Sequence, residues 1–164
     1  MKILIAGFKG DDNSAKILLD YIKKVCNEDI LYLENDFEIS SKQIEEKLLE
    51  NYDNVLIFGQ KPNTTNIYFE NNAFLEGKKL VTDYYYGALK EKLEQHAYNV
   101  MSSYDAGKYL CNNVFFRALN FKQKNNLKSK IAFIHIPTID NIEDMNRLSS
   151  SIKDYIETLC EEKK

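Results

Sequence analysis

Lys2-Ile3-Leu4-Ile5-Ala6 is a continuous apolar run behind a single lysine. Such a run is typical of a strand that is buried on both faces of a sheet. Asn54-Val55-Leu56-Ile57-Phe58 and Ile131-Ala132-Phe133-Ile134-His135-Ile136 have the same character, and shorter strands are predicted at 30–33 and 98–101. Helical segments separate these runs, and this alternation predicts an α/β fold, a three-layer sandwich with a mostly parallel, open twisted sheet.

The predicted helices follow from apolar spacing and from capping residues. Apolar side chains recur at helical spacing within 15–25. Ser40 with Gln43, and Asp140 with Glu143, have the spacing of capping boxes, and Asp83 is a candidate N-cap. We therefore expect helices near 15–25, 40–52, 83–96, 111–121 and 140–162. Gly7 is expected to open a turn after the first strand, and Gly59 is expected to end the strand at 54–58.

Composition limits the class of protein. A chain of 164 residues with 44% apolar content suits a single domain, 1–164. The net charge of −3 and the lack of a basic stripe argue against nucleic acid. No apolar run reaches the roughly 20 residues of a membrane span, and the N-terminus does not have the features of a secretory signal. Cys26, Cys111 and Cys160 form neither a disulfide framework nor a metal motif, which predicts a reduced, cytoplasmic setting.

Cys111 and His135 are the candidate reactive residues. The segment Tyr104–Phe116 has the pattern of a loop that feeds a helix, with Cys111 in the opening turns. The positive end of a helix favours a thiolate, so we expect a lowered thiol pKa and faster alkylation than at the other cysteines. His135 lies near the carboxyl end of a strand, where it could serve as the base. Taken alone, each is more simply explained as an ordinary core residue than as a reactive one.

The motifs around these two residues resemble a known family. Ala-Gly-x-Tyr-Leu-Cys-Asn at 106–112, followed by Phe-Ile-His-Ile-Pro at 133–137, resembles pyroglutamyl peptidase I, also called pyrrolidone-carboxylate peptidase. Segment 59–70 resembles the glycine-rich turn that leads to the catalytic glutamate of that family, and 1–8 resembles its first strand. The resemblance implies an α/β cysteine peptidase that needs no cofactor or metal.

The resemblance also assigns roles to individual residues. It implies that Cys111, His135 and Glu70 form a catalytic triad, in which Glu70 orients the histidine. Phe8 and Gln60 match positions around the pyroglutamyl pocket, and for Phe8 a packing residue at a strand end is an equal alternative. Ligands of open α/β sheets bind beyond the carboxyl ends of the strands, so we expect Phe8, Gln60, His135 and Cys111 to converge on one edge. For Glu70 alone, a place on a solvent-exposed strand face is the simpler alternative.

This chain departs from the family around the pocket. Gly7-Phe8-Lys9-Gly10 lacks the proline, second phenylalanine and paired glycines of the family motif, and 71–78 supplies no arginine after Glu70. Asn63-Thr64 replaces a glycine-arginine pair, and Asn113 replaces a histidine. The resemblance therefore implies a shortened and divergent member, with weakened action on pyroglutamyl groups.

Three functions follow from the sequence. The first is removal of an N-terminal pyroglutamyl or related small acyl group from a small peptide. The second is a catalytically weak or inactive relative that binds a small ligand or serves as a subunit, and a homo-oligomer is compatible with both. The third, independent of the resemblance, is a flavin or nucleotide module, for which 7–10 supplies only a fragment of a phosphate loop.

Overall fold

A six-stranded sheet forms the centre of the molecule, in the strand order β2-β1-β3-β8-β4-β7. The computed structural model describes residues 1–163. The strands are β1 (Ile3–Phe8), β2 (Asp29–Leu33), β3 (Asn54–Lys61), β4 (Ile67–Glu70), β5 (Asn72–Leu75), β6 (Lys78–Val81), β7 (Val100–Ser103) and β8 (Lys130–Pro137). β1, β2, β3 and β8 are parallel, whereas β4 pairs antiparallel with β8 and carries β7 parallel to itself.

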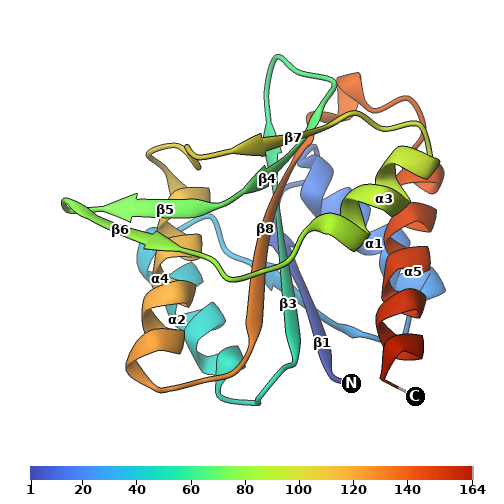
Figure 1. Cartoon of the computed structure of the whole chain (residues 1–164). Coiled ribbons are helices and arrows are strands. Elements are labelled where there is room, and N and C mark those ends of the chain that lie inside the picture. The colour runs from blue at the N-terminus through green and yellow to red at the C-terminus, as the bar shows by residue number, and fades with distance from the viewer. Residues whose placement is uncertain (164) are drawn as a thin grey trace.

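Helices cover both faces of this sheet. They are α1 (Ser14–Val25), α2 (Phe37–Leu48), α3 (Gly87–Gln95), α4 (Leu110–Lys124) and α5 (Met145–Glu162), with a short 3₁₀ helix at Ile139–Asn141. Figure 1 shows α1, α3 and α5 on one side of the sheet and α2 and α4 on the other. The three-layer α/β prediction is therefore confirmed.

Strand periodicity explains the two cores. Alternate residues of a strand point to opposite faces, so Leu56 and Ile134 pack with α1 and α5, whereas Ile57 and Phe133 pack with α2 and α4. His135 follows Phe133 by two residues and so faces α4, the helix that contains Cys111. This face of the sheet is the one that matters for the candidate site.

Two predicted strand ends are wrong. Gly7 and Gly59 do not open turns, since β1 continues to Phe8 and β3 continues to Lys61. In the sheet, Gly7 pairs with Phe58 and Gly59 pairs with His135. Pairing with β2 and β3 holds Gly7 extended, and pairing with β8 holds Gly59 extended, an influence that a local pattern does not contain.

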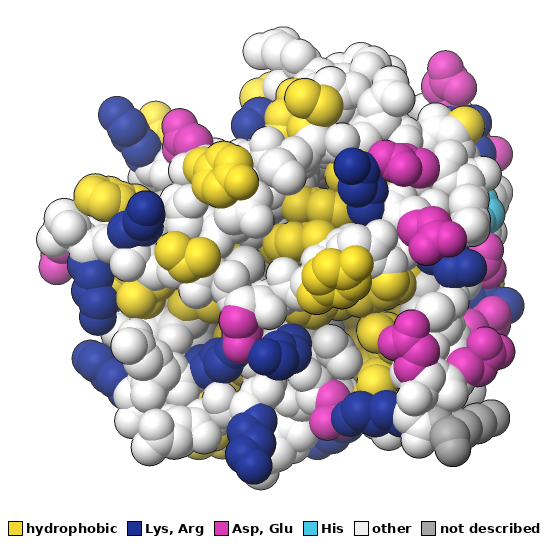
Figure 2. Space-filling view, viewed as in Figure 1, with side chains coloured by type: hydrophobic (Ala, Val, Ile, Leu, Met, Phe, Trp, Pro, Cys, Tyr) yellow, Lys and Arg dark blue, Asp and Glu magenta, His cyan; other side chains and the backbone are white. Residues whose placement is uncertain are grey.

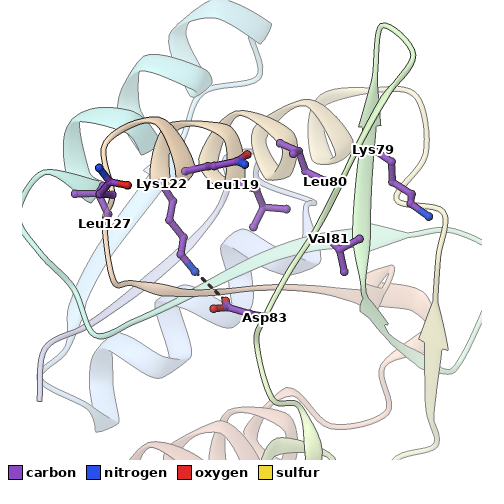
Figure 3. Close-up of a pocket in the computed structure, with 9 residues that line it drawn as sticks. Lys79, Leu80, Val81, Asp83, Leu119, Lys122 and Leu127 are labelled. Carbon is purple, nitrogen blue, oxygen red and sulfur yellow. Dashed lines mark hydrogen bonds and ion pairs between the residues drawn. The ribbon is translucent and has the colours of Figure 1, made fainter.

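Three predicted helix starts are also wrong. α2 begins a turn early because Asp36 Oδ1 accepts from the N–H of Ile39 at 2.8 Å, which leaves Ser40 inside the helix. The same kind of cap places the start of α5 after Asp144 rather than at Asp140. Asp83 caps no helix: its carboxylate binds Lys122 at 2.8 Å (Figure 3). Several residues near each start could serve as caps, and tertiary contacts select one of them.

The hairpin formed by β5 and β6 was not predicted. It lies apart from the main sheet, over α4 (Figure 1). The side-chain amide of Asn112 donates to Phe74 O at 2.8 Å and accepts from Phe74 N at 3.0 Å. The Asn112 side chain thus makes the pair of backbone hydrogen bonds to β5 that a neighbouring strand would otherwise make. Within residues 1–163, no helix is long and apolar enough to cross a membrane.

Candidate active site

Cys111 is the second residue of α4, as predicted. Tyr109 stands at the N-cap and makes no side-chain capping hydrogen bond. The first N–H groups of a helix have no partner within the helix, so an uncapped start leaves hydrogen-bond donors beside Cys111. These donors can stabilise a negatively charged oxygen formed next to the thiol.

His135 and Glu70 form a buried pair. His135 Nδ1 and Glu70 Oε1 are 2.9 Å apart, and the exposed fractions of the two residues are 6% and 0%. In the antiparallel register of β4 and β8, Tyr68 lies opposite His135, and Glu70 lies two residues further along the same face. Glu70 is therefore not on a solvent-exposed face. The pairing occupies Nδ1 and leaves Nε2 of His135 for chemistry.

Gly59 brings the thiol and the imidazole together. A Cβ atom on Gly59 would lie 2.6 Å from Cys111 Sγ, so the sulfur rests directly on this glycine. Gly59 is paired in register with His135 on the adjacent strand. Cys111, His135 and Gln60 line one pocket of about 300 Å³. No hydrogen bond joins Cys111 Sγ to His135 within residues 1–163, so the thiol is close to its expected base but not bonded to it.

Gln60 is fixed by the start of α1. Its Oε1 accepts from the backbone N–H of Ser14 at 3.1 Å, and the Ser14 hydroxyl donates to Pro137 O at 2.6 Å. Because Oε1 is occupied, the amide NH₂ of Gln60 is the group left for a ligand. Gln60 thus lies where the sequence placed it.

Phe8 does not reach the pocket. It is only 3% exposed and packs in the apolar cluster between the sheet and the helices α2 and α4. The pocket lining contains Gln60, Cys111 and His135 but not Phe8. The ring turns into the core rather than beyond the edge of the sheet, so Phe8 is the packing residue of the alternative reading and not the pocket wall that the resemblance implies.

The expected lowering of the Cys111 pKa is wrong for the resting protein. Burial, with a smaller contribution from the negative charge of Glu70, raises the pKa of the Cys111 thiol to about 12. Desolvation disfavours a thiolate, and here it outweighs the helix terminus. The resting residue is a neutral thiol, which has to lose its proton before it can attack a carbonyl.

We therefore expect Cys111 to alkylate slowly near neutral pH. Below the thiol pKa, the rate of reaction with iodoacetamide should rise about tenfold per pH unit, because the thiolate is the reacting form. Mass spectrometry of peptides after brief labelling between pH 7 and pH 10 measures this at each cysteine. Rapid labelling of Cys111 at pH 7, with little further rise, would show that the helix terminus dominates after all.

Tyr86 also supports the His135–Glu70 pair, although no pattern in the sequence pointed to it. Its hydroxyl donates to Glu70 O at 2.8 Å and accepts from Phe133 N at 3.0 Å. The ring stacks on Phe69 with centroids 4.6 Å apart. Tyr86 therefore joins the strand of Glu70 to the strand of His135 beside the pair. The only trace in the sequence is the Tyr84-Tyr85-Tyr86 run.

Gly59→Ala should disrupt the site. The added Cβ would meet Cys111 Sγ at 2.6 Å and the Phe133 ring at 3.1 Å, so the thiol must move. We expect roughly 1–3 kcal/mol of destabilisation, typical of overpacking, together with altered alkylation of Cys111. Thermal unfolding and labelling measure the two effects. Gly7→Ala is the control, since the atoms nearest to its Cβ would belong to Leu19 and Ala15, on the opposite face of the sheet from Cys111. Equal effects of both substitutions on Cys111 would contradict a local role for Gly59.

Other surface features lie apart from this pocket. A hollow between β6 and α4 is lined by Leu80, Leu119 and Lys122, with Asp83 at its base (Figure 3). Figure 2, in the view of Figure 1, shows hydrophobic side chains gathered near the centre of this face and others lying singly, with cations and anions scattered among them. The exposed apolar residues of the hairpin and of β7 include Phe74, Val81 and Met101. No single-sign charged stripe crosses this face.

Comparison with known proteins gives a consistent result. Residues 85–159 match the Peptidase_C15 family model, described as pyroglutamyl peptidase. No curated protein matches the chain. The part of the chain matched by the family model includes Cys111 and His135.

Solved structures with the same fold are pyrrolidone carboxyl peptidases. A mutant enzyme from Pyrococcus furiosus is 19% identical, with a TM-score of 0.82 and 99% of each chain covered. The enzyme from Thermococcus litoralis is 21% identical, with a TM-score of 0.77 and 98% of this chain and 96% of that one covered. Pyroglutamyl peptidase I from Bacillus amyloliquefaciens is 18% identical, with a TM-score of 0.78 and coverage of 93% and 91%. Taken together, residues 85–159 match the pyroglutamyl peptidase family model, and the whole chain has the fold of the pyrrolidone carboxyl peptidases.

Proposed function

We propose that this protein is a cysteine peptidase that removes an N-terminal pyroglutamyl or related small acyl group from short peptides. Cys111 is the nucleophile, His135 the general base and acid, and Glu70 the group that orients His135. The observation that carries the proposal is the buried hydrogen bond of 2.9 Å between His135 and Glu70, in the wall of the pocket that Cys111 lines.

The reaction begins with proton transfer from the Cys111 thiol to His135 Nε2. The sulfur then attacks the scissile carbonyl, and the uncapped N–H groups of α4 stabilise the oxyanion. His135 returns the proton to the leaving amine as the C–N bond breaks, which leaves a thioester on Cys111. Water, activated by His135, hydrolyses the thioester and restores the thiol. Glu70 stabilises the positive charge that His135 carries between these steps.

Pyroglutamyl substrates should be cleaved weakly. The second phenylalanine and the arginine of the family pattern are absent from this chain, and Phe8 is in the core rather than against the pocket. Loss of apolar contact in a small pocket lowers the preference of an enzyme for the substrate that fits the pocket by roughly 10- to 200-fold. We expect kcat/KM on a pyroglutamyl amide to be lower by about that factor than for an enzyme with the full family pattern.

Hydrolysis of a panel of N-terminally blocked aminoacyl amides tests the proposal. The panel contains pyroglutamyl, acetyl, formyl and succinyl groups, and each is assayed before and after complete alkylation of the protein. We expect at least one substrate to be cleaved, and cleavage to stop after alkylation. Cleavage that survives alkylation would place the chemistry outside Cys111.

A second function, a weak relative that binds a ligand without efficient turnover, is supported by two observations. The Cys111 thiol has a pKa raised to about 12 and is not hydrogen-bonded to His135 within residues 1–163. Calorimetric binding of a blocked amide without measurable hydrolysis would favour this function. A reduced cytoplasmic setting is part of both proposals, and it is supported by the three unpaired cysteines.

A further inference from the structure

The pocket of Cys111 is lined by two lysines. Lys61 directly follows Gln60 on β3, and Lys108 lies in the loop before α4. Within residues 1–163, neither forms an ion pair with a carboxylate; Lys61 Nζ instead lies 4.5 Å from the centroid of the Tyr68 ring. Two positive charges are thus present at the pocket without an anionic partner from the described chain.

The remaining polar groups of the pocket are mainly donors as well. Gln60 presents its NH₂ because Ser14 occupies Oε1. The start of α4 presents uncapped N–H groups. Among residues 1–163, Asp105 is the only carboxylate in the lining, and its Oδ1 accepts from the N–H of Gly107 at 2.9 Å. A site that offers donors and cations is complementary to a ligand rich in acceptors and negatively charged.

We propose that the substrate carries a carboxylate close to the scissile bond, and that Lys61 and Lys108 bind it. This inference rests on the proposed function and narrows its substrate class. A neutral lactam would use the amide of Gln60 but would leave both lysines without a partner. The carboxylate could be the free C-terminus of the leaving amino acid, which makes the substrate a dipeptide, or a carboxylate within the acyl group.

Matched pairs of compounds separate these two sources. Pyroglutamyl-alanine is compared with pyroglutamyl-alanine amide for the leaving side, and succinyl-alanine amide with acetyl-alanine amide for the acyl side. We expect the charged member of one pair to have a kcat/KM higher by roughly tenfold, the scale of a charge-assisted hydrogen bond. The ratio should fall as ionic strength rises, because salt screens partly exposed charges.

Lys61→Met and Lys108→Met should each reduce this ratio, and the double variant should bring it close to one. Lys128→Met is the matched control. It removes an equal charge from the loop before β8, at the opposite end of the strand from His135, and should leave the ratio unchanged. A ratio near one in the native protein, or a ratio equally sensitive to Lys128→Met, would overturn the inference.

Binding to Cys111→Ala separates this inference from the proposed function. Calorimetry with the same four compounds measures recognition without turnover. Tighter binding of a charged compound, lost in the double lysine variant, would support carboxylate recognition even if the native protein hydrolysed nothing. Hydrolysis of all compounds without any preference for charge would support the peptidase and reject the role of the lysines. Failure of every compound to bind would reject the inference.

Discussion

Cys111→Ala is expected to abolish hydrolysis of every substrate that the native protein cleaves. Loss of the nucleophile from a triad of this kind lowers kcat by about 10⁶. The fold should survive, because the substitution removes one half-buried atom, a loss on the order of 1 kcal/mol. Steady-state kinetics with a calorimetric unfolding curve on the same preparation measures both.

Cys26→Ala and Cys160→Ala provide the matched controls. Both cysteines pack against the apolar cluster on the opposite face of the sheet from Cys111. Each control variant also loses one sulfur atom, but at a site away from the pocket of Cys111. Hydrolysis should therefore remain near the native rate. Activity that persists in Cys111→Ala, or that falls equally in all three variants, would rule out Cys111 as the nucleophile.

Glu70→Gln should lower kcat by about 10³- to 10⁴-fold, the scale seen when the carboxylate of a triad is neutralised. The glutamine can still accept from His135 Nδ1, but it no longer offers a negative charge to the imidazolium.

Glu70→Gln should also lower the stability of the fold. Glu70 Oε2 has no hydrogen-bond partner in residues 1–163, so an amide NH₂ there is a buried unpaired donor. This should reduce the free energy of unfolding by about 1–3 kcal/mol.

The same substitution should raise the alkylation rate of Cys111. The negative charge of Glu70 contributes to the raised pKa of the Cys111 thiol, so its removal lowers that pKa and increases the thiolate fraction. Faster labelling with slower catalysis is a combination that simple unfolding does not produce. Glu46→Gln, on the exposed surface of α2, is the control and should change neither rate. Unchanged catalysis in Glu70→Gln would remove Glu70 from the mechanism.

Much of the architecture could be predicted from the sequence. The apolar runs that became β1, β3 and β8 are decisive, because burial of a strand on both faces requires apolar residues without alternation. Cys111 at the start of α4 and His135 near the end of β8 are likewise local features of loop, helix and strand. The partnership with Glu70 came only through the resemblance, since no periodicity links residues that are 65 positions apart.

The sequence by itself determined most of the main strands and helices and singled out Cys111 and His135 as candidates, because periodicity and capping act within a few residues. Only the tertiary structure decided how those side chains behave. It set the contact of Cys111 with Gly59, the burial of Glu70 and the place of Phe8 in the core. It also reversed the expected direction of the Cys111 pKa. Desolvation and charge–charge interactions depend on every group that packs nearby, and those groups come from distant parts of the chain.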